Sequence, residues 1–82
     1  MNRLEALSCA IREARLAAGL SQERLAEVAH VHRNLVGLLE RNERNPTVGS
    51  LLAIADGLGV PASKLLARAE VLAEDSRRMD EA

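Results

Sequence analysis

The sequence predicts a compact all-α domain built from five short helices. Phe, Tyr and Trp are absent although 48% of the 82 residues are hydrophobic, so Leu, Ile, Val and Ala have to form the core, and such residues pack well between helices. The few Gly and Pro residues fall between segments of helical periodicity, as helix punctuation should. A chain of this length forms one domain with a single small core.

The first helix is expected over about residues 2–18, where apolar side chains recur at helical spacing. Gly19 ends it, because glycine tolerates the left-handed conformation of a helix C-terminus. Ser21 then caps a second helix. The turn that follows begins at His30, one of the non-glycine residue types that best tolerate a positive φ angle. The third helix is short and is expected from about His32 to Arg41.

A polar loop with turn chemistry separates the third helix from the two helices that follow. Thr47 is the expected cap of a fourth helix, which we expect Gly57 and Gly59 to stop. Pro61 or Ala62 begins a fifth helix with a leucine-rich apolar stripe.

Charge is distributed unevenly along the chain. The formal net charge is −1, but residues 1–69 carry nine Lys and Arg against seven Asp and Glu, whereas residues 70–82 carry two against five. The apolar periodicity stops near residue 74, and we therefore expect a domain of residues 1–73 and a frayed acidic tail of residues 74–82. A local basic patch is enough to meet phosphates, so the net charge does not exclude a nucleic-acid partner.

Residues 22–41 contain two short amphipathic patterns separated by only three or four residues. In such a helix-turn-helix the first helix supports the second, which projects its polar face away from the core. The small Ala26 lies where the two helices have to cross closely. This arrangement predicts a module that binds double-stranded DNA.

Several other classes of protein are disfavoured. The single Cys9 excludes an internal disulfide and a multi-cysteine metal site, and His30 and His32 are not spaced to share a helix face. We find no paired carboxylates, nucleophile–base arrangement or phosphate loop, so we expect no enzymatic activity and no cofactor. Without a signal peptide or a long apolar run, we expect a cytoplasmic protein with no membrane partner.

Five segments in order resemble the lambda-repressor-like helix-turn-helix family, also called the xenobiotic response element family of bacterial and phage regulators. The resemblance covers about residues 8–67, and residues 39–45 are also similar to the small dimeric controller proteins of restriction–modification systems. The segments are Ile11-Arg12-Glu13-Ala14-Arg15, Gly19-Leu20-Ser21-Gln22-Glu23-Arg24-Leu25-Ala26, Leu39-Glu40-Arg41-Asn42, Asn45-Pro46-Thr47 and Leu58-Gly59-Val60.

The resemblance implies that the third helix is a recognition helix in the major groove. It also implies a partly buried, structural ion pair between Arg15 and Glu40. Phosphate contacts, base-edge contacts and the groove floor would together involve eight residues. These are Gln22, Arg33, Asn34, Gly37, Leu38, Arg41, Asn42 and Arg44. Position 32 usually carries a Ser, Thr or Asp cap in the family, and we expect the His32 found here to be a ninth DNA contact instead.

Arg33 and Asn34 have the side chains best suited to reading bases. A guanidinium can bond both acceptors of a guanine edge, and an amide can pair with adenine. The alternative is that both residues belong to an ordinary solvated helix face. Leu35 and Leu38 are similarly open to two interpretations, since single exposed leucines are common and Leu35 can also pack against another helix.

One recognition helix reads only a few base pairs, and members of the resembling family pair to read a palindromic operator. We therefore expect a homodimer through the fourth and fifth helices, using Leu65, Leu66, Ala69 and Leu72. The alternative is that this stripe merely closes the core of the monomer. A competing functional hypothesis is a protein-interaction module, such as the antitoxin of a toxin, whose acidic tail orders on its partner.

Overall fold

The computed structural model describes residues 1–81 and contains five helices and no strand in that range. The all-α, five-helix prediction is confirmed. No single helix of the described chain is both long enough and apolar enough to cross a bilayer. In chain order the helices are α1 (Arg3–Ala17), α2 (Gln22–Ala29), α3 (Leu35–Glu40), α4 (Val48–Leu58) and α5 (Ala62–Glu81).

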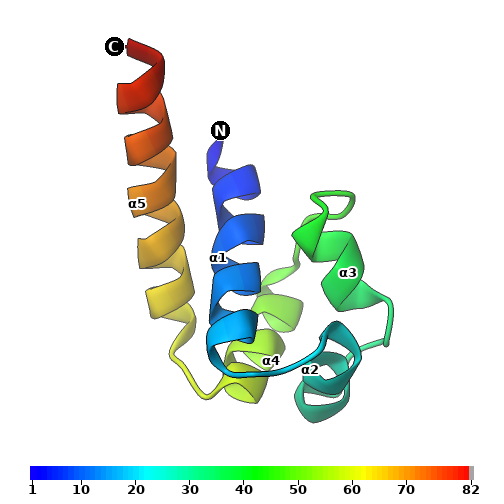
Figure 1. Ribbon diagram of the computed structural model, residues 1–82. Coiled ribbons are helices and arrows are strands. Elements are labelled where there is room, and N and C mark those ends of the chain that lie inside the picture. The colour runs from blue at the N-terminus through cyan, green and yellow to red at the C-terminus, as the bar shows by residue number, and fades with distance from the viewer. Residues whose placement is uncertain (82) are drawn as a thin grey trace.

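Helices α1 and α5 lie side by side and antiparallel along the long dimension of the molecule (Figure 1). Helix α2 packs against α4 and α3, and α3 also contacts α1. Figure 1 shows α3 on the side of the molecule away from α5, with the C-terminal turns of α5 extending past the start of α1. The helix-turn-helix pair is therefore held by α1 and α4, with α5 on the opposite side.

The core is made of aliphatic side chains, as the absence of aromatic residues requires. Its largest fully buried members come from four different helices, so that each helix depends on the others for burial. They are Ile11, Leu25, Val36, Leu39 and Ile54.

All four connections between the helices contain a residue in the left-handed conformation near the preceding helix end. Gly19 and Gly59 both have a φ of 72°, His30 has 57° and Asn42 has 56°. After each of them, the next amide donates to a carbonyl five residues back at 2.9–3.1 Å, which is the bond that defines a Schellman helix end. His30, a residue type that tolerates positive φ, does adopt it, and Asn42 is a second non-glycine example.

Helix α3 begins at Leu35, three residues later than we expected. The Leu35 amide donates to the His32 carbonyl at 2.9 Å, a three-residue bond, and the first four-residue bond runs from Leu38 to Asn34 at 3.2 Å. Residues 32–34 thus form a turn before the helix proper. Arg33 lies in this turn and not on a helix face.

One expectation about a helix end was also wrong, because Gly57 lies inside α4 and only Gly59 ends that helix. Helix α5 runs to Glu81. The Met1 ammonium donates to Ser76 Oγ on α5 at 2.6 Å. The fraying expected of residues 74–82 stays a prediction.

Candidate nucleic-acid interface

The helix-turn-helix unit is fixed by local bonds and by close packing of small residues. Ser21 caps α2 by accepting the Arg24 amide at 3.0 Å, as predicted. Ala26 and Ala29 are 1% and 5% exposed, so that the neighbouring helices approach α2 closely. The resulting unit holds the start of α2 beside α3.

A hollow of about 310 Å³ opens where the start of α2 meets α3. Six of the nine predicted DNA-binding residues line it, together with Glu23, which the sequence analysis did not select. The lining residues are Gln22, Glu23, Arg33, Asn34, Gly37, Leu38 and Arg41. Residues from the start of α2, the turn before α3 and the end of α3 thus meet at one polar concavity.

His32 holds the turn that leads into α3. Its Nδ1 atom accepts a hydrogen bond from the Asn34 amide at 3.2 Å. The imidazole thus holds the turn, while Asn34, the N-cap residue of α3, makes no side-chain capping bond. Arg33 and Asn34 are both exposed at this turn, with their side chains on the hollow.

Arg15 and Glu40 form the ion pair that the resemblance implied. Arg15 Nε and Nη2 donate to the two Glu40 carboxylate oxygens at 2.7 and 2.9 Å. Arg15 Nη1 also donates to the Leu20 carbonyl at 2.8 Å, and the hydrogen bond to Glu40 raises the pKa of Arg15. This pair attaches the end of α3 to α1.

Gln22 connects the pair to the hollow. Its Nε2 donates to Glu40 Oε1 at 3.1 Å. Its side-chain oxygen lies close to Gly37, since a Cβ built on Gly37 would be 3.1 Å from it and 2.9 Å from Arg41 Nη1. Gly37 is therefore buried beneath two polar side chains at the floor of the hollow.

The remaining predicted residues lie beyond the hollow. Asn42 is the left-handed residue that ends α3, and its Oδ1 is 3.5 Å from Ser8 Oγ. Arg44 is exposed in the loop that follows. Glu43, which the sequence analysis missed, forms an ion pair with Arg41. The available signal was a carboxylate only two residues after a predicted DNA-contacting arginine.

The expected dimer stripe is largely part of the monomer core. Leu65 and Ala69 are 3% and 4% exposed, and Leu72 is half-buried, whereas Leu66 is 46% exposed. These three covered residues face α1, because α1 and α5 are packed along much of their length. Of the four residues, only Leu66 remains open to a partner.

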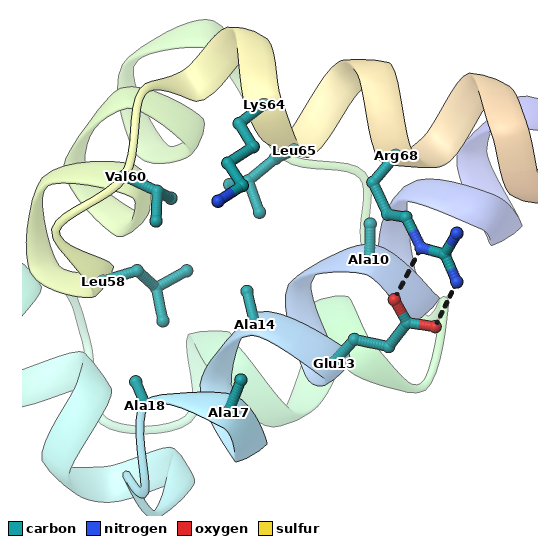
Figure 2. A pocket seen from close by; sticks show the side chains of 10 residues that line it. All are labelled: Ala10, Glu13, Ala14, Ala17, Ala18, Leu58, Val60, Lys64, Leu65 and Arg68. Carbon is teal, nitrogen blue, oxygen red and sulfur yellow. Dashed lines mark hydrogen bonds and ion pairs between the residues drawn. The ribbon is translucent and has the colours of Figure 1, made fainter.

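A second hollow, of about 430 Å³, lies between α1 and the corner formed by α4 and α5 (Figure 2). Short alanine side chains of α1 leave this space opposite Leu58, Val60 and Leu65. Arg68 Nε donates to Glu13 Oε2 at 2.8 Å along one edge, and this bond lowers the pKa of Glu13. None of the predicted site residues lines this hollow. Within residues 1–81 no cluster of three potential metal ligands occurs.

Comparison with known proteins agrees with this geometry. A helix-turn-helix family model matches residues 11–65. Control protein C.SmaI of Serratia marcescens is 41% identical over 68 residues, which are 83% of this chain and 81% of that protein. The crystal structure of the restriction–modification controller protein C.AhdI from Aeromonas hydrophila superimposes with a TM-score of 0.73 at 37% identity, over 76% of this chain and 94% of that one.

A longer regulator shares the same unit. The helix-turn-helix transcriptional regulator SutR of Escherichia coli K12 is 43% identical over 60 residues. Those residues are 73% of this chain but only 34% of SutR. The chain therefore belongs to the lambda-repressor-like helix-turn-helix family of DNA-binding transcriptional regulators.

Proposed function

We propose that this protein regulates transcription by binding a palindromic operator as a homodimer, with α3 in the major groove. The observation that carries this proposal is the polar hollow at the start of α2 and α3. There Gln22, Arg33, Asn34 and Arg41 gather on one exposed face. Amides and guanidinium groups are the side chains that bond phosphates and base edges.

The roles in the hollow follow from position. Arg33 and Asn34 lie at the turn before α3 and are the proposed base readers, with His32 and Leu38 beside them. Gln22 is the proposed phosphate contact on α2, while its hydrogen bond to Glu40 keeps it in place. At and beyond the C-terminal end of α3, the proposed backbone contacts are Arg41, Asn42 and Arg44.

The dimer contact is proposed on α4 and α5, but with a different set of side chains from the one we expected. Val48 and Leu52 on α4 are 75% and 51% exposed, and Leu66 on α5 is 46% exposed. Burying such side chains against a second copy removes apolar surface from water, which favours association. Leu52→Glu and Leu66→Glu should shift the protein from dimer to monomer in sedimentation, while Leu16→Glu on exposed α1 surface should not.

Selection of genomic fragments by the purified protein at physiological salt tests operator binding. We expect a motif with two half-sites about 34–36 Å apart. Arg33→Ala should degrade the motif, while Arg78→Ala, at the remote end of α5, should not. Failure of the wild-type protein to enrich any motif would overturn the proposed function. The alternative hypothesis, a protein-interaction module such as an antitoxin, predicts negligible DNA binding in the same experiment.

A further inference from the structure

Arg41 is the one arginine of the polar hollow that is paired with a carboxylate. Its Nε donates to Glu43 Oε2, and the two side chains are 59% and 54% exposed. Arg33, which lines the same hollow, has no ion-pair partner within residues 1–81. The charge of Arg41 is thus neutralised within the chain before any DNA arrives.

Gly37 determines where the Arg41 guanidinium lies. A Cβ on Gly37 would be 2.9 Å from Arg41 Nη1, a separation that real Cβ atoms essentially never show. Arg41 therefore rests against the backbone of α3 only because residue 37 has no side chain. Any larger residue would displace the guanidinium from this position.

A carboxylate and a phosphate are alternative partners for the same guanidinium. Carboxylate and phosphate oxygens can each accept two parallel hydrogen bonds from the N–H groups of arginine. An exposed ion pair of this kind is held weakly, because water screens it and both side chains lose conformational freedom. Breaking the Arg41–Glu43 pair therefore costs little free energy, and a DNA phosphate can take the place of the Glu43 carboxylate.

We propose that Glu43 takes the place of a DNA phosphate on Arg41, and that Gly37 positions Arg41 for the exchange. This inference rests on the proposed function, since it assigns a partner to one side chain of that interface. When DNA binds, the Arg41 guanidinium stays against Gly37 and its partner changes from the Glu43 carboxylate to a backbone phosphate. Glu43 then remains near the DNA as an uncompensated negative charge, so it lowers affinity.

The test measures the affinity for a duplex that carries the selected motif, as a function of salt concentration. Each phosphate neutralised contributes about −0.9 to the slope of log K against log salt. Arg41→Gln should therefore make the slope shallower by about 0.9. Glu43→Gln should raise affinity by about threefold at physiological salt and make the slope steeper.

The double variant separates exchange from simple repulsion. In the Arg41→Gln background, Glu43→Gln should raise affinity by clearly less than it does in the wild-type protein. Glu70→Gln, which removes the same charge from the Arg3 pair between α1 and α5, is the matched control and should change neither affinity nor slope. An equal gain from Glu43→Gln in both backgrounds, or no gain in the wild type, would overturn the proposal.

Gly37→Ala tests the positioning role. Its Cβ meets only the ends of two flexible side chains, Arg41 Nη1 and Gln22 Oε1, so the fold should keep its melting temperature. We expect a loss of affinity together with the shallower slope of Arg41→Gln, and no further slope change when the two are combined. A melting temperature that falls, or an unchanged slope, would contradict this role. Absence of DNA binding by the wild-type protein would instead overturn the proposed function and this inference together.

Discussion

Glu40, at the end of α3, receives two hydrogen bonds from Arg15 of α1, and its side chain is only 2% exposed. Gln22 donates to the same carboxylate at 3.1 Å. The carboxylate therefore joins α1, α2 and α3 at one buried point. Because α3 has only six residues, this attachment fixes its C-terminal end more firmly than its own backbone bonds can.

Glu40→Gln should destabilise the domain strongly. The change leaves the Arg15 guanidinium, whose side chain is 10% exposed, without its counter-charge. Breaking a buried pair from one side costs about 3–5 kcal/mol of unfolding free energy. Urea unfolding measures the loss. Glu13→Gln removes the exposed partner of Arg68 and should cost under about 1 kcal/mol, and similar losses for the two variants would contradict the burial argument.

His30→Gly should stabilise the protein. His30 has a φ of 57°, and the left-handed region costs an L-residue roughly 1–2 kcal/mol that glycine does not lose. Part of this gain is offset because glycine is more flexible in the unfolded chain. Thermal unfolding should show a higher melting temperature. Gly59→Ala, at a helix end with the same left-handed backbone, should lower the melting temperature. Opposite shifts in the two variants would support the explanation by backbone conformation, and shifts in the same direction would contradict it.

The two glycines inside α4 should respond to alanine in opposite directions. A Cβ on Gly49 meets nothing nearer than 3.9 Å, so Gly49→Ala should stabilise the helix by about 0.5–1 kcal/mol. A Cβ on Gly57 would be 3.2 Å from both the nitrogen and the Cα of Ala29, so Gly57→Ala has to push α2 away from α4. Chemical denaturation gives the free energy of unfolding of the two variants. If both substitutions stabilise the protein, α2 and α4 can move apart at little cost and the packing argument is wrong.

His32→Ala should weaken the entry to α3, because it removes the acceptor of the Asn34 amide. Loss of one such hydrogen bond typically costs about 1 kcal/mol. His32→Ser supplies an oxygen acceptor instead and should restore stability. Amide hydrogen exchange of residues 34–38 is the measurement, and equal protection in the two variants would show that the imidazole bond does not hold this turn.

Local signals in the sequence were sufficient for the caps at Ser21 and Thr47 and for the left-handed Gly19 after α1. Those features depend on one residue and its immediate neighbours. The start of α3 was misplaced because His32 offers the next amides both a carbonyl and a ring nitrogen, which favour a turn over a helix. Periodicity alone does not show that choice.

The leucine stripe of α5 and the surroundings of Gly37 could not be predicted for a different reason. A leucine stripe shows that a face is covered but not by what, and here Leu65 and Ala69 are buried where α5 packs against α1. The position of Gln22 against Gly37 likewise depends on a contact between two helices.

Because the sequence contains no Phe, Tyr or Trp, the protein has almost no absorbance or fluorescence in the near ultraviolet. A single tryptophan introduced into the chain would be the only fluorophore of a protein–DNA complex, because DNA bases emit almost no light in solution. Leu38, half-buried at the edge of the polar hollow, is the natural position for such a label. The emission of a Leu38→Trp protein would then report the approach of DNA to α3 without interference from the rest of the chain.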